Sequence, residues 1–307
     1  MNYSDTNIPI RERVQNYFRS LQLSICSALE LEDGKGIFIE DEWRREGGGG
    51  GFTRVIENGN VIEKGGVNFS SVEGELPTTL AKRMNIESTD FFATGVSLVI
   101  HPYSPRIPTV HANFRYFEQS NGDSWFGGGA DLTPFIPDEF SAIHFHNTLK
   151  SSCDPFGFDL YPKYKKWCDE YFYIKHRKES RGIGGIFFDY IRDASNNQES
   201  NFAFVRSCGD SFIESYLPIV KARKFEEFTE REKKFQSLRR GRYVEFNLVY
   251  DRGTTFGLET GGRTESILMS LPPVVNFDYN ADLHTNANEV KLMKWFETPI
   301  DWVSYQI

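Results

Sequence analysis

The spacing of apolar residues in the first quarter of the chain predicts one helix and one hairpin. Between residues 8 and 31 apolar side chains recur at helical spacing, and Asp33-Gly34 is a helix stop. The glycine run 47–51 is typical either of a flexible loop or of a loop beside a ligand. Residues 52–70 alternate around Asn58-Gly59, which predicts a β-hairpin that turns there.

Strict alternation of apolar and polar residues predicts a strand over 110–117, and residues 91–101 are predicted to form another strand. The connection 102–109 holds three prolines, and we expect it to join the two strands as an antiparallel pair. The remaining pattern predicts helices at 138–152, 163–180, about 200–238 with an interruption at Pro218, and 286–296, and strands at 186–191, 242–251 and 267–273. We therefore expect a single α+β domain over residues 1–307, with mainly antiparallel strands and helices packed over them.

Composition limits the classes of partner. A net charge of −8 argues against a nucleic-acid surface or an anionic membrane, although a cleft can still attract an anionic small molecule. No apolar run approaches membrane-spanning length, and no signal or transit peptide is recognisable. The four cysteines are far apart and form no C-x-x-C pair, which disfavours disulfides, zinc ribbons and iron–sulfur clusters. We expect a protein of the reducing cytoplasm.

The most informative stretch is 110–134, VHANFRYFEQSNGDSWFGGGADLTP. Its first strand places His111, Asn113 and Arg115 on one face: a group that can move a proton, an amide and a cation suited to a carboxylate. Three glycines then allow close backbone approach, and Asp131 follows them. The segment predicts a site for an anionic ligand that also carries N–H or O–H donors. The alternative is a solvated sheet face with scattered polar residues.

Pairing of the two strands would add Ser97 and His101 to the same surface. A metal site built from His101, His111, His146 and His176 is one interpretation of the histidines. Spacing favours the other, in which they are hydrogen-bonding core or pocket residues, because His144 and His146 point to different sides of a helix.

The loop GLETGGR, residues 257–263, has no P-loop pattern, and the chain has no G-x-G-x-x-G motif between a strand and a helix. We interpret this loop as backbone N–H groups that bind a carboxylate together with Arg263. We expect no nicotinamide, flavin or other organic cofactor.

Several long motifs resemble the oxygen-dependent coproporphyrinogen III oxidase family. They are EDEWRREGGGGG, GVSLVIHP, PTVHANFRYF, WFGGGADLTP, KKWCDEYFYIKHRKESRGIGGIFFD and GRYVEFNLVYDRGTTFGLETGGRTESILMSLPP. The resemblance runs from about the first helix to the C-terminal WV. It implies a large antiparallel sheet between layers of helices, a homodimer, and oxidative decarboxylation of the ring A and B propionates of coproporphyrinogen III to vinyl groups. The products implied are protoporphyrinogen IX, CO2 and H2O2, with O2 as co-substrate.

The resemblance also implies roles for individual residues. His111 matches the proton donor, and residues 243–278 match a dimerisation segment. The positions that match substrate contacts are Ser97, Asn113, Arg115, Gly261, Gly262 and Arg263. The positions that match a divalent metal site described in bacterial members, which is not general in the family, are His101, His111, His146 and His176.

The residues themselves suit this chemistry. The substrate is a tetracarboxylate macrocycle, so Arg115 and Arg263 would bind propionates, and Asp131 would accept bonds from the pyrrole N–H groups. An electron-rich porphyrinogen can react with O2 without a flavin, which fits the absence of cofactor motifs. Two alternatives remain open: a non-haem metal-dependent oxygenase, and a tetrapyrrole-binding protein without catalysis. The oxygen-independent enzyme of the same step would need clustered cysteines.

Overall fold

The computed structural model describes residues 3, 5–75, 90–192, 198–259 and 261–307. Its centre is a seven-stranded sheet in the order β1-β2-β3-β4-β5-β6-β9, in which every neighbouring pair is antiparallel. The strands are β1 Ile39–Arg44, β2 Gly49–Glu57, β3 Ile62–Glu75, β4 Asp90–Pro102, β5 Thr109–Gln119, β6 Ser124–Thr133 and β9 Gly185–Ile191, and a separate two-stranded hairpin is formed by β7 Tyr173–Ile174 and β8 Glu179–Ser180.

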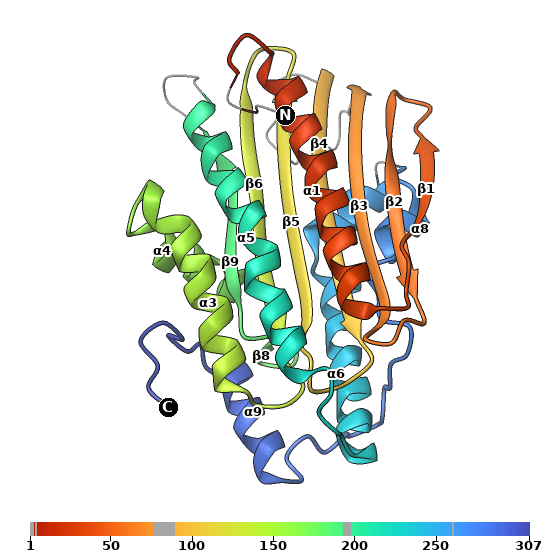
Figure 1. Cartoon of the computed structure of the whole chain (residues 1–307), viewed down its shortest axis with the longest axis vertical. Helices are drawn as coiled ribbons and strands as arrows, with labels where there is room; N and C mark the ends of the chain where they lie inside the picture. Colours follow the sequence, from red (N-terminus) through yellow and green to blue (C-terminus); the bar gives the residue numbers. More distant parts are fainter. Residues whose placement is uncertain (1–2, 4, 76–89, 193–197, 260) are drawn as a thin grey trace.

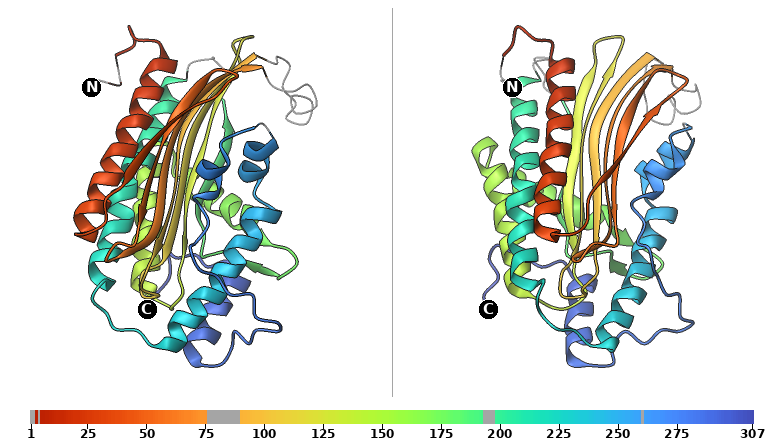
Figure 2. Two further views of the ribbon diagram at one scale, coloured as in Figure 1. Left: turned by 90° about the vertical axis from the view of Figure 1, so that its right-hand side faces the viewer. Right: turned by 45° about the vertical axis from the view of Figure 1, so that its right-hand side comes forward.

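Helices cover both faces of the sheet, as Figures 1 and 2 show. Helices α1, α3 and α5 form one layer, and α6, α7 and α8 lie on the opposite face, while α4 packs beside β9. The helices are α1 Ile10–Asp33, α3 Glu139–Cys153, α4 Leu160–Tyr171, α5 Glu199–Arg223, α6 Glu230–Val249, α7 Arg252–Glu259, α8 Thr264–Leu268 and α9 Ala287–Glu297, with a 3₁₀ turn at Asp154–Phe156. None of the helices in the described ranges is long and apolar enough to cross a bilayer. The α+β fold predicted from the sequence is confirmed.

The two faces of the sheet differ in polarity because the strands alternate. In β5, Val110, Ala112, Phe114 and Tyr116 are buried against the layer of α1 and α5 and belong to the main core. The alternate residues face the layer of α6 to α8, and three of them, His111, Asn113 and Arg115, are partly exposed. Helix α1, the 52–70 hairpin and the pairing of β4 with β5 all form as the sequence predicts.

The predicted strand at 242–251 is wrong, because these residues lie in α6. This helix begins with a capping box in which Thr229 and Glu232 exchange hydrogen bonds. Its buried residues Phe235, Arg239, Tyr243 and Phe246 are spaced by three or four, and this spacing outweighs the short alternation seen in the sequence. The predicted strand at 267–273 is also wrong, since Ile267 and Leu268 end helix α8 and Leu271 follows in a turn.

Helix α5 is not interrupted at Pro218 as predicted. A proline inside a helix removes the hydrogen bond to the carbonyl four residues earlier, here that of Glu214. That carbonyl instead lies 2.9 Å from Nε2 of His144 on the neighbouring helix α3. The neighbouring layer therefore supplies the lost partner, and the helix continues to Arg223.

Two further segments differ from the prediction. The helix expected over 163–180 ends at Tyr171, and the chain turns back through the small β7–β8 hairpin, where Lys178 has a φ of 57°. Residues 49–51 of the glycine run belong to β2 and are not part of a flexible loop. A Cβ atom on Gly51 would lie 2.2 Å from the carbonyl oxygen of Phe69, so only glycine fits the strand spacing there.

Candidate active site

The register of three central strands brings the predicted polar residues together on one face. Ser97 on β4 pairs with Asn113 on β5, and His111 pairs with Asp131 on β6. Directly opposed residues of an antiparallel pair share a face, so these side chains all point toward the layer of α6 to α8. His101 lies on the same face at the end of β4, where it reaches Thr109. The face predicted from the alternation is therefore formed.

His111 and Asp131 are joined by a hydrogen bond of 2.8 Å between Nδ1 and Oδ1. The Asp131 side chain is 1% exposed, whereas that of His111 is 21% exposed. Burial alone would raise the pKa of the Asp131 carboxyl, but the Arg181 guanidinium and the hydrogen bond from His111 hold this pKa below its ordinary value. The pair is thus a buried carboxylate that orients a histidine at the edge of the site.

Arg181 completes this arrangement, although it was not predicted from the sequence. Its NH2 group donates to both oxygens of Asp131, at 2.8 and 2.9 Å, and its NH1 group donates to Oδ1 of Asn247 at 2.7 Å. The guanidinium also lies over the rings of Phe172 and Tyr243. The proximity of Asp131 raises the pKa of Arg181 despite its burial.

The only sequence signal for Arg181 is its place in the motif ESRGIGG, directly before the glycines that lead into β9. Its hydrogen-bond partners come from β6 and α6, which are distant in sequence. Alternation along one strand therefore could not reveal this residue.

Arg115 lies two residues after Asn113 on the same face of β5. Both terminal nitrogens of its guanidinium contact a neighbouring side chain. Its NH1 group donates to Oδ1 of Asn113 at 2.7 Å, and its NH2 group lies 3.0 Å from Oδ2 of Asp189 on β9. The side chain is 36% exposed, the most open of the charged groups in this row of the site. A cation that is fixed but open is suited to binding an anionic ligand.

Arg263 lies on the same face but at the other edge of the sheet. It precedes α8 and forms an ion pair with Asp41 on β1. Four strand spacings, about 19 Å between backbones, separate β1 from the strand of Arg115. Gly261 has a φ of 69°, in the left-handed region, and Gly262 donates to the carbonyl of Gly257. The structure therefore places Arg263 itself well apart from Arg115, near the β1 edge of the sheet.

An aromatic cluster lies on the same face of the sheet, beyond Arg115 along β5. Phe91, Phe117 and Trp125 pack together beyond Arg115, and Phe256 of α7 packs against them. At its start, α7 is fixed by Asp251, which accepts a hydrogen bond of 2.8 Å from the hydroxyl of Tyr171. The polar residues of the face thus end at a buried aromatic cluster, which α7 covers.

The four histidines expected from the family resemblance to bind a metal do not meet within the chain. His146 is buried on α3, in the helical layer on the opposite face, and its Nδ1 atom lies 2.9 Å from the hydroxyl of Tyr161. His176 lies in the β7–β8 turn and not on a helix, and it contacts Glu245 and Tyr250. Within the described ranges no three His, Cys, Asp or Glu side chains are grouped so that they could hold a metal ion. These residues do not fit a shared metal site in one chain.

Burial explains why two of these histidines are uncharged. It lowers the pKa of His101 and of His146 well below the ordinary value, and nearby cations lower both further. His101 is bonded to Thr109 and to the carbonyl of Ser270. Both are neutral core residues at neutral pH, as the alternative interpretation of the histidines predicts.

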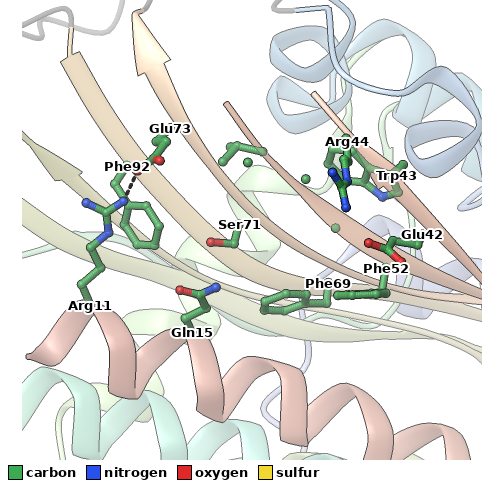
Figure 3. Close-up of a pocket in the computed structure, with 14 residues that line it drawn as sticks. Arg11, Gln15, Glu42, Trp43, Arg44, Phe52, Phe69, Ser71, Glu73 and Phe92 are labelled. Carbon is green, nitrogen blue, oxygen red and sulfur yellow. Dashed lines mark hydrogen bonds and ion pairs between the residues drawn. The ribbon is translucent and has the colours of Figure 1, made fainter. Parts of the chain in front are cut away.

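A cavity of about 370 Å³ lies on the other face of the sheet, between α1 and strands β1 to β3 (Figure 3). Arg11 and Gln15 of α1 line it, with Phe52, Phe69 and Phe92 from the strands. None of the residues predicted to bind substrate lines it. The candidate site is therefore placed on the face that carries His111, where acid–base and cationic groups occur together.

A histidine oriented by a buried carboxylate, next to a partly exposed arginine, is an arrangement typical of an enzyme site that takes an anionic substrate. Comparison with known families specifies the class further. The chain belongs to the coproporphyrinogen III oxidase family, whose model matches residues 13–302, nearly the whole chain. The protein is accordingly an oxidoreductase of porphyrin biosynthesis that carries out an oxidative decarboxylation, with coproporphyrinogen III as the substrate of the family.

Proposed function

We propose that this protein uses O2 to convert coproporphyrinogen III to protoporphyrinogen IX, without an organic cofactor. The observation that carries the proposal is the chain of contacts from Arg181 through Asp131 to His111, next to the exposed Arg115. The sequence adds support for the use of O2, because the cysteines needed to hold an iron–sulfur cluster are not grouped in it. Cys26, Cys153, Cys168 and Cys208 are buried in four different helices.

Arg115 binds a propionate of the substrate in this proposal. Its guanidinium presents N–H donors in a planar fork that matches a carboxylate, and Asn113 and Ser97 line the same row of the sheet. Arg263 binds a second carboxylate, after its release from Asp41. The backbone N–H groups of Gly261 and Gly262 do not take part, because they donate to Leu258 and Gly257 within the loop.

His111 moves a proton during the decarboxylation. Its Nδ1 atom is engaged by Asp131, and Nε2 makes no hydrogen bond within the described part of the chain. An ionised Asp131 keeps the proton of the neutral ring on Nδ1, so Nε2 is the atom that can accept and return a proton.

Asp131 acts through His111 and not by entering the ring of the substrate. Direct acceptance of pyrrole N–H bonds, as expected from the sequence, needs an open carboxylate. Both oxygens of Asp131 are bonded to Arg181, and the side chain is 1% exposed. We therefore assign it the role of a positioning residue that fixes the tautomer and orientation of His111.

The chemistry balances with O2 as the only oxidant. Each propionate loses CO2 and two hydrogen equivalents as its two methylene carbons become a vinyl group. O2 accepts the two electrons and two protons and leaves as H2O2. Orientation of one propionate at a time is the main task of the protein, because the electron-rich pyrrole supplies the electrons.

A comparison of turnover in air and under argon tests this proposal. Purified protein treated with a chelator should form protoporphyrinogen IX in air and none under argon. Loss of activity on chelation that returns with a divalent metal would favour the non-haem metal oxygenase. Binding of coproporphyrinogen III without turnover in air would favour a non-catalytic tetrapyrrole-binding protein.

We further propose that the protein is a homodimer through residues 243–278 and functions in the cytoplasm, without nucleic-acid partners. Support for the dimer comes from the exposed apolar side chains of this segment, which are Leu248, Val249, Leu258, Val274 and Phe277. The four free, buried thiols suit a reducing compartment. Sedimentation of the wild type and of Leu248→Asp tests the dimer: we expect a dimer for the first and a monomer for the second. A monomeric wild type at micromolar concentration would contradict it.

A further inference from the structure

Strand β9 carries a bulge beside the candidate active site. Phe188 pairs with Gly128 and Ile191 pairs with Phe126, so Asp189 and Tyr190 together oppose the single residue Gly127. Tyr190 has a φ of 51°, a left-handed conformation that is uncommon for a residue with a side chain. Bulges redirect side chains, and strained residues gather at functional sites. The bulge is therefore expected to redirect a side chain at this site.

The side chain that the bulge turns toward the site is that of Asp189. Its Oδ2 atom lies 3.0 Å from NH2 of Arg115, and its Oδ1 atom accepts the backbone N–H of Tyr190 at 2.9 Å. A Cβ atom on Gly127 would lie 2.6 Å from Oδ1 of Asp189 and 2.8 Å from Nε of Arg115. The bulge and the glycine together create the space in which the carboxylate meets the guanidinium.

We propose that Asp189 is a positioning residue for the carboxylate-binding Arg115, an inference that rests on the function proposed above. Asn113 holds the NH1 end of the guanidinium from its own strand, and Asp189 holds the NH2 end from β9. Two anchors fix the plane of the fork before substrate arrives, which removes part of the entropy cost of binding. The Asp189 side chain is 14% exposed, so it acts on the substrate through Arg115.

A different role for Asp189 would change substrate affinity in the opposite direction. If Asp189 only neutralised Arg115 in the empty site, it would compete with the substrate carboxylate, and its removal would tighten binding. Arg192, the other cation near Asp189, is already paired with Asp123. Removal of Asp189 therefore changes the anchoring of Arg115 and leaves the pair of Arg192 intact.

Binding of coproporphyrin III, the stable oxidised ring with the same four carboxylates, tests the proposal without need of turnover. Quenching of tryptophan fluorescence gives Kd for the wild type and the variants, and KM and kcat are measured with coproporphyrinogen III. Asp189→Asn should raise Kd and KM on the order of tenfold with kcat nearly unchanged, and Asp189→Glu should recover part of the loss. The matched control is Asp123→Asn, which removes an exposed Asp–Arg pair on the neighbouring turn and should leave Kd unchanged.

A double-mutant cycle separates positioning from general destabilisation. In an Arg115→Lys background, Asp189→Asn should change Kd by less than about twofold, because the group it positions is gone. A lower Kd for Asp189→Asn, an unchanged Kd, or full additivity with Arg115→Lys would overturn the proposal. If the wild type binds the ring but does not turn over in air, the proposed function fails while the Kd values still test Asp189. If the wild type does not bind the ring, both fail.

Discussion

Asp131 and Arg181 form a buried ion pair in which one NH2 group donates to both carboxylate oxygens, and the two side chains are 1% and 2% exposed. Oδ1 of Asp131 also accepts the hydrogen bond from Nδ1 of His111. A change at either residue should therefore affect both the stability of the fold and the chemistry of the site.

Asp131→Asn should lower the free energy of unfolding by about 3–5 kcal/mol, because it leaves the Arg181 charge buried without its partner. The rate should fall as well, since the amide no longer fixes the tautomer of His111. Urea unfolding of the variant measures the first effect. Asp123→Asn, which breaks an exposed ion pair, is the control and should cost less than about 1 kcal/mol. Unchanged stability of Asp131→Asn would show that the ion pair is not coupled to folding.

His111→Gln should fold normally and bind substrate within a modest factor, but lose about 10²–10⁴ in kcat. The reason is that glutamine keeps hydrogen-bonding capacity and cannot move a proton at neutral pH. Steady-state kinetics and the Kd for coproporphyrin III separate the two effects. The control is His284→Gln, at an exposed histidine near α9, and it should keep full activity. A variant at His111 with normal kcat would remove this residue from the mechanism.

Arg115→Lys keeps the positive charge but loses the planar fork. Loss of a charge-assisted contact should cost about 1.5–3 kcal/mol of substrate binding, measured as an increase in Kd. Arg263→Ala should cost a similar amount if substrate draws Arg263 away from Asp41. An unchanged affinity of Arg263→Ala would show that the edge of the sheet at β1 does not take part in binding.

The pKa of Glu245 is lowered to about 2, although burial alone would raise it, because Arg177, His176 and Arg242 contact its carboxylate. A carboxyl whose folded pKa lies below its unfolded value of 4.5 stabilises the fold above pH 4.5, and this stabilisation is lost as the pH falls toward 2. The difference in unfolding free energy between wild type and Glu245→Gln should therefore shrink between pH 5 and pH 3. The exposed Glu170→Gln should show a small difference across this range. A constant difference for Glu245→Gln would refute the pairing.

The sequence predicted the polar face well because that face depends on local alternation and on the pairing of adjacent strands. His111, Asn113 and Arg115 share a face through the period of one strand, and Ser97 joins them through a short antiparallel connection. Residues 242–251 form a helix and not the predicted strand because of packing. Phe235, Tyr243 and Phe246 are all buried only if the segment is helical.

The other features that the sequence did not predict depend on contacts between distant parts of the chain. Arg181 gains its role from Asp131 and Asn247, which lie 50 and 66 residues away. The position of Arg263 is set by its pair with Asp41 on the edge strand, and the bulge that places Asp189 is visible only in the register of β6 and β9. Such relationships have no periodic signal in a single sequence.

The central claim is that O2 is the oxidant, and the stoichiometry of turnover tests it most directly. O2 uptake, H2O2 formation and protoporphyrinogen IX should be measured together on chelator-treated protein, with coproporphyrinogen III as the only other reactant. Because two propionates are oxidised, the account predicts two O2 consumed and two H2O2 released for each protoporphyrinogen IX formed. Product formed under argon at the rate seen in air, without O2 uptake, would contradict it.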